Sequence, residues 1–172
     1  MNKKGLLAGL FLFTLPTIVW ATESVEKIFI DADHMHMDII SGKSVYTGNV
    51  KISQGELVLL GDKVTLDSSN NKVERMTVIG KPARYNHVTE DGKTIKAQSE
   101  HMVYIANQNK LILTINANLQ QPDLKLNSQK ITYDTKKKIV IAGSNDGATD
   151  TDAKQNQRVK ITLTPKESPA DQ

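Results

Sequence analysis

Two histidines placed two residues apart are the part of this sequence best suited to metal chemistry. His34 and His36 lie in a stretch rich in aspartate. Its three carboxylates are Asp31, Asp33 and Asp38. In an extended strand, residues i and i+2 point to the same face, so the two imidazoles would stand side by side. With a neighbouring carboxylate they would suit Zn²⁺ or Cu²⁺, so a structural or metal-binding periplasmic β protein is one function to consider.

The simpler interpretation is that this strand turns its histidines to solvent. Met35 and Met37 alternate with the histidines and would then face a core. A structural metal site takes about four ligands, and the other two histidines, His87 and His101, are distant in the sequence. We therefore favour the solvated histidine face and predict no metal site.

The sequence carries no signature of catalysis. It has no G-x-S-x-G elbow for a serine nucleophile and no glycine-rich phosphate loop. Its acidic residues fall mostly in turns, where aspartate is favoured for backbone reasons. We therefore predict a protein that is not an enzyme and that takes no cofactor.

The first 21 residues have the layout of a secretory signal peptide. Lys3 and Lys4 precede an apolar run, and small Ala21 ends it at the position where a signal peptidase would cut. We predict cleavage after Ala21 and export to a bacterial periplasm. The chain has no cysteine, so its stability must come from burial and hydrogen bonds without disulfides.

Removal of the leader also changes the charge balance. The whole chain has 22 basic and 19 acidic residues, and losing Lys3 and Lys4 leaves 20 basic residues, a net charge of +1. The single tryptophan, Trp20, also lies in the leader. A nearly neutral chain with few aromatic residues favours no nucleic-acid partner.

Beyond the leader, the sequence reads as short strands separated by turns. Alternating apolar and polar residues, rich in Val, Ile, Thr and Tyr, recur almost throughout. Residues 67–71 and 89–93 have turn composition, residues 48–49 fit a turn or a bulge, and residues 80–82 (Gly-Lys-Pro) are expected to end a strand. No run with helical period exceeds a turn or two. The sequence therefore predicts an all-β domain over residues 22–164, with a flexible tail over residues 165–172.

A short strand motif returns four times, at residues 33–35, 62–64, 100–102 and 129–131. The first and third copies lie 67 residues apart, and so do the second and fourth. With this offset, residues 46–67 align on residues 113–134 without a gap, and Asn, Gln, Thr and Asp positions match as well as apolar ones. Such a period indicates two similar halves in a stacked repeat.

A stack of short antiparallel strands has two exposed edges. We expect the first edge at residues Lys27, Ile28, Phe29, Ile30 and Asp31. The second is expected at Val159, Lys160, Ile161, Thr162 and Leu163. Neither strand contains proline, so both edges could pair head-to-tail with further copies of the chain. The alternative is that the loop over residues 144–158 or the tail covers an edge.

The apolar residues of the predicted strands are mostly aliphatic. Residues 57–60 (Leu-Val-Leu-Leu) do not alternate, so both faces of that strand should be buried or one should face a ligand. If its own side chains do not fill the interior, it would suit acyl chains, each buried CH₂ being worth roughly 0.8 kcal/mol. A filled core is the alternative.

At this point the motifs resemble a known family. They are the series Tyr46-Thr47-Gly48-Asn49-Val50, Gln54-Gly55, Asp62-Lys63-Val64, Gly80-Lys81-Pro82-Ala83, Met102-Val103-Tyr104, Asn118-Leu119-Gln120-Gln121 and Lys130-Ile131-Thr132-Tyr133. In this order they are similar to the OstA-like family of periplasmic lipopolysaccharide-transport proteins, to which the bridging A component of the Lpt pathway belongs. The resemblance covers about residues 27–165.

The resemblance implies an open, slightly twisted antiparallel β-jellyroll of about 16 short strands. It also implies a non-enzymatic carrier that stacks head-to-tail into a periplasmic bridge and moves lipopolysaccharide from the inner to the outer membrane. The implied partners are the lipid A acyl chains of lipopolysaccharide, further copies of the chain, the inner-membrane C component and the outer-membrane D component.

The family's interior lipid contacts map onto Ile28, Tyr85, Tyr104 and Ala106. Ala106 departs from the larger aliphatic residue usual at that position. A second departure is Ile115, which stands before Asn116 where the family usually has glycine.

Overall fold

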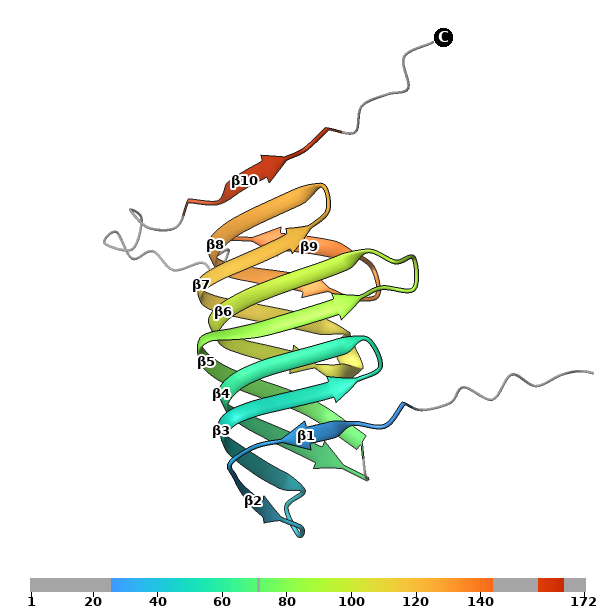
Figure 1. Cartoon of the computed structure of the whole chain (residues 1–172), viewed down its shortest axis with the longest axis vertical. Coiled ribbons are helices and arrows are strands. Elements are labelled where there is room, and N and C mark those ends of the chain that lie inside the picture. The colour runs from blue at the N-terminus through green and yellow to red at the C-terminus, as the bar shows by residue number, and fades with distance from the viewer. Residues whose placement is uncertain (1–25, 71, 144–157, 166–172) are drawn as a thin grey trace, which may run out of the picture.

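The computed structural model describes residues 26–70, 72–143 and 158–165 (Figure 1). The predicted signal peptide, nearly all of the predicted loop over residues 144–158 and the tail beyond residue 165 lie outside the described residues. The described part is an antiparallel β structure with one 3-10 turn, η1 (Ala106–Gln108). Its strands are β1 (Phe29–Asp31), β2 (His34–Asp38), β3 (Lys43–Gln54), β4 (Leu57–Ser69), β5 (Lys72–Val88), β6 (Thr94–Ile105), β7 (Lys110–Gln121), β8 (Leu124–Asp134), β9 (Ile139–Ala142) and β10 (Lys160–Leu163).

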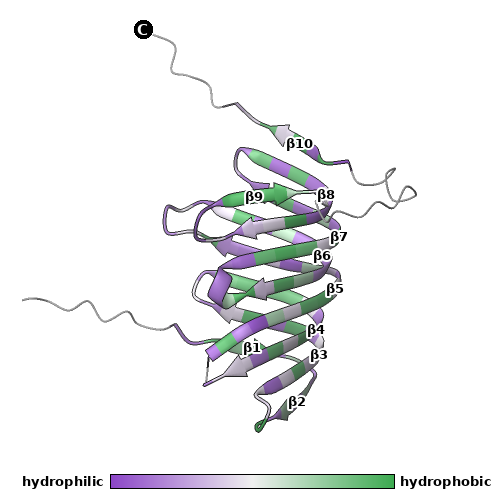
Figure 2. Cartoon of the chain, turned by 180° about the vertical axis from the view of Figure 1, so that it is seen from behind, coloured by the Kyte–Doolittle hydropathy of each residue, from purple (hydrophilic) through white to green (hydrophobic). Residues whose placement is uncertain are grey.

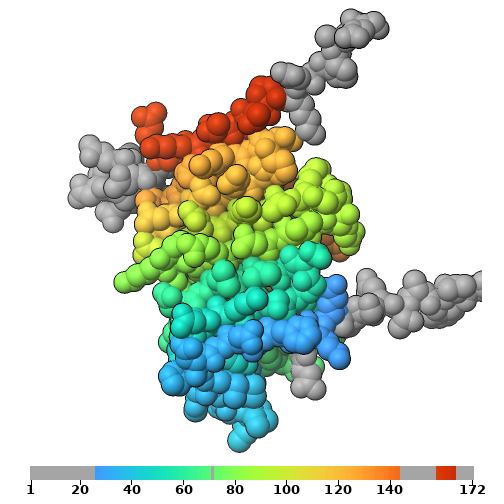
Figure 3. Space-filling view, in the orientation of Figure 1, coloured from blue at the N-terminus to red at the C-terminus, as the bar shows by residue number. Residues whose placement is uncertain are grey.

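These strands form one sheet in which sequence neighbours pair. The order is β1-β3-β4-β5-β6-β7-β8-β10, with β2 also on β3 and β9 also on β8. The space-filling view shows the chain rising in successive tiers from one end to the other (Figure 3). Each inner tier therefore contacts only the tiers next to it, as the repeat in the sequence predicts.

A crease divides each of the six long strands into two arms. The pairing register shifts in the middle of every ladder between them, for example between Thr47 and Val50 of β3 and between Ile79 and Ala83 of β5. Extra residues at such bulges bend a strand. The sheet therefore folds over itself into two layers, with the crease at the left of Figure 1 and hairpin turns at the right.

We call the two halves of the folded sheet layer A and layer B. Layer A contains β1, β10 and residues 50–54, 57–60, 83–88, 94–98, 117–121 and 124–128. Layer B contains β2, β9 and residues 43–47, 63–69, 72–79, 101–105, 110–114 and 130–134. Layer A is the front layer in Figure 1.

The predicted fold class is confirmed, although the structure counts ten strands where the resemblance implied about sixteen. Residues 48–49 and 80–82 bend β3 and β5 without ending them, so the expectation that residues 80–82 stop a strand is wrong. Counting both arms of the six long strands, together with the four short strands, gives sixteen segments. The difference is therefore one of where a bent strand is divided.

The hydrophobic core lies between the two layers. Strand residues alternate between this interface and solvent, a pattern visible as green and purple bands in Figure 2. Leu113 and Leu119 of β7 and Ile131 of β8 have no exposed surface. None of these three residues lines a cavity, so the interior beside them is filled by the protein's own side chains.

The two halves repeat an unusual backbone at the crease. Gly48 and Asn49 have φ of +80° and +46°, and Ile115 and Asn116, 67 residues later, have φ of +65° and +57°. Ile115, which stands where the resemblance implies a glycine, therefore keeps the same bulge. A β-branched residue rarely adopts this left-handed conformation.

The fourfold motif is buried in three copies and exposed in the first. Val64, Met102 and Ile131 are each at most 1 % exposed, whereas Met35 is 60 % exposed and Met37 is 49 % exposed. The expectation that Met35 and Met37 face a core is therefore wrong for the single chain. Both lie on β2, which pairs with β3 and ends layer B, so no further tier of the described chain covers them.

No helical segment within residues 26–70, 72–143 and 158–165 has the length and apolar character needed to cross a membrane.

Candidate functional site

A cavity of about 490 Å³ opens between the two layers. It lies away from the crease, toward the free ends of the arms. Its lining comes from both layers and from the segment before β1: Glu26, Ile28, Gln54, Leu57, Leu59, Lys72, Val73, Met76, Val78, Tyr85, His87, Met102, Tyr104, Ala106, Leu111 and Thr135. A space of this size is within the range of small-ligand pockets.

The walls of this cavity are apolar because inward positions of β4, β5 and β6 converge on it. Leu59 and Tyr85 come from layer A, and Met76, Val78 and Met102 come from layer B. All five are buried. The aliphatic and thioether side chains make a smooth surface that suits flexible hydrocarbon chains.

Polar groups gather where the cavity meets solvent. Lys72, Glu26 and Thr135 line it there, and the Gln54 amide donates a 3.3 Å hydrogen bond to the Glu26 carbonyl. An amphiphile with its chains inside would therefore place its head among charged groups. The cavity thus has an apolar body and a polar rim.

Tyr85 and His87 join the wall to this rim. The Tyr85 hydroxyl lies 3.2 Å from His87 Nδ1, and the two rings meet edge to face with centroids 6.1 Å apart. Burial lowers the pKa of His87, and the nearby positive charge of Lys138 lowers it further. Burial also raises the pKa of the Tyr85 hydroxyl well above its ordinary value. Both groups are therefore neutral at pH 7 and present no charge to an apolar ligand.

The structure brings the four predicted lipid-contact residues together in this one cavity. Tyr85 is buried, Tyr104 and Ala106 are half-buried, and Ile28 stands exposed just before β1. The sequence predicted no lipid contact for the remaining wall residues. Leu57 and Leu59 were noted for their unbroken apolar run and Met102 for its place in the fourfold motif, and the strand alternation of Met76 and Val78 is shared with every core position.

The predicted edge residues lie at opposite ends of layer A. Phe29, Ile30 and Asp31 form β1 on β3, with Lys27 and Ile28 just before it. Lys160, Ile161, Thr162 and Leu163 form β10 on β8, with Val159 just before it. Sequence reasoning missed that layer B has its own end strands, β2 and β9. Met35 and Met37 of β2 and Ile139 and Ile141 of β9 are exposed, and nothing in their local sequence pattern distinguishes them from core residues.

The two histidines that opened the sequence analysis lie on the exposed strand β2. His34 is opposite Thr47 and His36 is opposite Val45, neither of which is a metal ligand of the usual kind. Among the described residues, no group of three or more His, Cys, Asp or Glu side chains is placed to hold a metal ion. Asp33 instead accepts a 3.0 Å hydrogen bond from the Asn49 amide at the crease.

Comparison with known proteins agrees with this architecture. Residues 29–139 match the family model described as LptA/(LptD N-terminal domain) LPS transport protein. The lipopolysaccharide export system protein LptH of Pseudomonas aeruginosa is 33 % identical over 143 residues, which cover 82 % of this chain and 81 % of LptH. The lipopolysaccharide export system protein LptA of Escherichia coli is 28 % identical over 144 residues, covering 83 % of this chain and 78 % of LptA.

A solved structure shares the fold. The crystal structure of LptH, described as the LptA-homologous periplasmic component of the conserved lipopolysaccharide transport device of Pseudomonas aeruginosa, aligns with a TM-score of 0.72 at 33 % identity. The alignment covers 81 % of this chain and 96 % of that chain. The family model, the sequence similarity and the shared fold agree, and the chain therefore belongs to the LptA/LptD N-terminal domain family of lipopolysaccharide transport proteins.

Proposed function

We propose that this chain carries lipopolysaccharide by sheltering its acyl chains in the cavity between layers A and B. The observation that carries the proposal is the cavity itself, with its apolar walls and its polar rim. An acyl chain that enters it leaves water at a gain of roughly 0.8 kcal/mol per CH₂. Nothing in this role requires a covalent step, so the protein acts as a carrier and not as an enzyme.

The four residues Ile28, Tyr85, Tyr104 and Ala106 contact the acyl chains in this proposal. Tyr104 is the best reporter among them, because it is half-buried and its side chain lines the cavity. Its neighbour Val103 lies on the opposite face of β6, since residues alternate along a strand.

A photocrosslinking amino acid at either position tests the proposal in cells. A crosslinker at Tyr104 or Tyr85 should capture lipopolysaccharide, and one at Val103 should not. Capture from Val103 with none from Tyr104 would show that lipid meets the outer surface and that the cavity is not the carrier site.

We also propose that copies of the chain stack head-to-tail. One end of the stack exposes Met35, Met37, Ile39 and Ile40, and the other exposes Ile139, Ile141, Ile161 and Leu163. Exposed apolar side chains beside unpaired strand edges are surfaces that a second chain can cover.

The strand directions fit such a junction. In layer A, β1 runs toward the crease and β10 runs away from it, because each is antiparallel to the adjacent arm of β3 or β8. In layer B, β2 runs away from the crease and β9 runs toward it. If the layers continue from one copy to the next, β10 meets β1 and β9 meets β2, both antiparallel. The antiparallel alternation of strand directions would then continue from one copy to the next. Such a head-to-tail contact is heterologous and builds open filaments.

Removal of one edge tests this assembly. Deletion of residues 159–172 should abolish concentration-dependent oligomers in analytical ultracentrifugation. The matched control deletes only residues 166–172, leaves β10 in place and should sediment like the intact chain. Oligomers that survive the longer deletion would show that β10 is not part of the junction.

The location and partners follow from the same proposal. Residues 1–21 form a signal peptide cleaved after Ala21, and residues 22–164 form the jellyroll domain. The stacked chains bridge the periplasm between the inner-membrane C component and the outer-membrane D component of the Lpt machine. The support is the family membership and the presence of pairing edges at both ends.

A further inference from the structure

The outer face of layer A carries a row of polar residues that crosses five strands. Arg84 of β5 is opposite Gln98 of β6, which is opposite Asn118 of β7. Asn118 is opposite Asn127 of β8, and Asn127 is opposite Lys160 of β10. Residues directly opposite in antiparallel strands share a face, so all five stand in one line.

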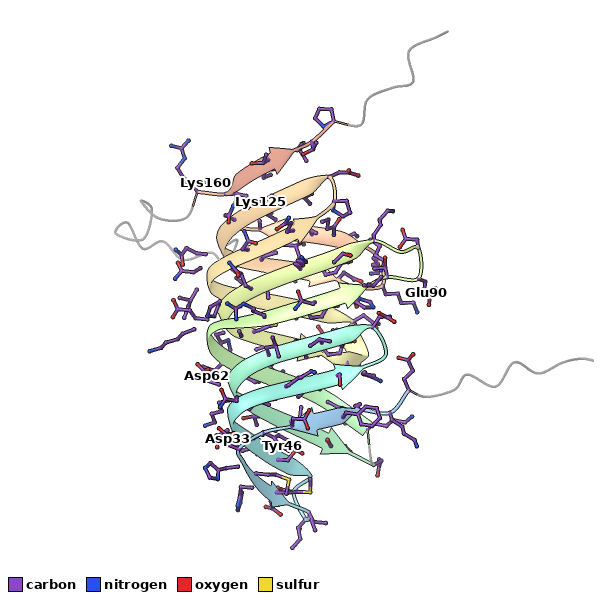
Figure 4. The ribbon with its side chains drawn as sticks, viewed as in Figure 1. Asp33, Tyr46, Asp62, Glu90, Lys125 and Lys160 are labelled. Atoms are coloured by element: carbon purple, nitrogen blue, oxygen red, sulfur yellow. The ribbon has the colours of Figure 1, made fainter. Side chains whose placement is uncertain are left out.

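A second row runs beside the first across the same strands. It passes from Asn86 through Lys96, Gln120 and Lys125 to Thr162, again by directly opposed pairs. We call these two rows, ten residues in all, the amide–cation face. Figures 3 and 4 look onto layer A from this side, and Figure 4 labels Lys125 and Lys160 on the neighbouring strands β8 and β10.

Two depressions of about 530 and 280 Å³ are built on this face. The larger is lined by Gln98, Asn116, Ala117, Asn118, Asn127, Ser128, Gln129, Arg158 and Lys160. The smaller is lined by Arg84, Asn86, Lys96, Ala97, Gln98, Asn118, Gln120 and Lys125. No residue of either lines the cavity between the layers, and neither lining contains a carboxylate or an aromatic ring among the described residues.

The cations of this face have no carboxylate partner in the part of the chain that the structure describes. The salt bridges there join Lys43 to Asp67 and Lys93 to Asp91, and neither involves Arg84, Lys96, Lys125 or Lys160. At the margin of the larger depression, Glu100 accepts a 2.7 Å hydrogen bond from the amide of Asn116 at the crease. A chain of near-neutral charge thus gathers positive charge on one face.

The amides between these cations are arranged for hydroxyl-rich ligands. A carboxamide offers both donors and an acceptor, as a sugar hydroxyl does, and Asn118 and Asn127 are held by a hydrogen bond from one amide to the other. Lys and Arg form charge-assisted hydrogen bonds with phosphate or carboxylate. The lack of aromatic rings disfavours nucleic acid, whose bases bind such surfaces by stacking.

We propose that the amide–cation face binds the phosphorylated saccharide of a lipopolysaccharide, at a site separate from the acyl-chain cavity. The ligand class, an acidic oligosaccharide, follows from the face alone, whereas its source rests on the proposed function. The saccharide and the acyl chains would then bind different surfaces of the stack. Binding at either surface could therefore be abolished without loss of binding at the other.

An acyl-free phosphorylated core oligosaccharide tests the face directly, because it has no chain to place in the cavity. Titrated into the protein purified from cells, it should bind by calorimetry and weaken as salt rises from 50 to 200 mM. The double substitution Lys96→Gln/Lys125→Gln should weaken binding about tenfold or more through lost charge-assisted hydrogen bonds. The matched control, Lys63→Gln/Arg75→Gln, removes the same charge from exposed outer positions of layer B and should leave binding unchanged.

The other outcomes are equally decisive. Equal weakening by both pairs of substitutions would show diffuse attraction and overturn the site. The site would also be overturned if a single-stranded oligonucleotide bound as tightly as the oligosaccharide, or if the oligosaccharide did not bind at all. Lipopolysaccharide capture from Tyr104, measured in the same protein, separates the two proposals: capture without oligosaccharide binding overturns the face alone, and absence of capture overturns the carrier function.

Discussion

The Asn116 amide donates a 2.7 Å hydrogen bond to the Glu100 carboxylate, and the same bond occurs 67 residues earlier between Asn49 and Asp33 at 3.0 Å. In each half, the asparagine has positive φ and sits in the bulge at the crease. Asparagine tolerates this backbone better than other non-glycine residues. The two bonds therefore fasten the crease at equivalent tiers of the two halves.

Replacement of Asn116 should weaken the stack. Asn116→Ala loses both the hydrogen bond and the tolerance for positive φ, and we expect a loss of about 1–2 kcal/mol in the free energy of unfolding. Asn116→Asp should also destabilise, because it loses the donated hydrogen bond and sets a second carboxylate against Glu100. Urea unfolding of both variants gives the measurement. An Asn116→Asp variant as stable as the unmodified chain would contradict the role given to this bond.

Glycine at position 115 should stabilise the protein. Ile115 has φ +65° and is half exposed, so the left-handed backbone costs energy while little packing is at stake. We expect Ile115→Gly to raise the free energy of unfolding by about 1 kcal/mol, since relief of strain exceeds the entropy that glycine loses on folding. Thermal and urea unfolding would both report it.

The matched control is the reverse change at the equivalent position. A Cβ at Gly48, with φ +80°, would overlap the Asp33 carboxylate. Gly48→Ala should therefore destabilise. If Ile115→Gly and Gly48→Ala shift stability in the same direction, the strain assigned to position 115 is wrong.

His87 should make stability fall in mild acid. Burial lowers its pKa in the folded chain, with a further contribution from Lys138, so the unfolded chain binds a proton first as the pH decreases. The contribution is complete above the ordinary histidine pKa of about 6.5 and is lost progressively below it. Replacement by a residue that cannot titrate removes this component.

Urea unfolding at pH 7.0 and 5.5 measures the effect. His87→Gln should lose less stability between these values than the unmodified chain. His34→Gln, on the exposed strand β2, is the matched control and should behave like the unmodified chain. If His34→Gln reduced the loss of stability between the two pH values as much as His87→Gln, the pH dependence could not be attributed to the burial of His87.

A larger side chain at position 106 should tighten lipid binding. Ala106 is half-buried at the rim of the cavity and follows β6 in η1. Ala106→Leu adds three carbons that an acyl chain can cover, each worth up to about 0.8 kcal/mol when fully buried. We expect affinity for a lipid A-type amphiphile to rise several-fold. Ala106→Asn, a polar change of similar size, should not raise it, and equal gains from both would show that contact area is not the cause.

Sequence reasoning recovered the repeat because the offset of 67 carries polar matches as well as apolar ones. Asn49 and Asn116 matched in the sequence, and the structure gives them the same φ region and the same kind of partner. Burial alone does not require asparagine, so its recurrence reports backbone geometry. The fold class followed from this and from the period-two alternation.

The division of strands was harder to predict because glycine and proline have two uses. The Gly-Asn pair of β3 and residues 80–82 of β5 could each end a strand or bend one. Whether the strand ends or bends there depends on whether both of its arms pair with the same neighbouring strands. Such pairing joins residues far apart in the sequence. For the same reason Met35 and Met37 were assigned to a core: their pattern matches Met102, but β2 has no tier beyond it in the described chain.

The candidate site was predictable only in part. Tyr85, Tyr104, Ala106 and Ile28 came from family resemblance, and they meet in one cavity. The amide–cation face was not foreseen, since its ten residues come from five strands and only the register sets them in line. Short-range patterns show which way a side chain points, but not which distant side chain stands opposite it.

The sequential order of the sheet has a consequence for cooperativity. Because each tier is held only by its neighbours, local stability should decline from the middle strands toward β1, β2, β9 and β10. Amide hydrogen exchange would record this as a gradient of protection along the stack, with the terminal tiers opening first. A neighbouring chain that covers one end would slow exchange at that end alone. The exchange pattern would therefore show which of the two ends is occupied.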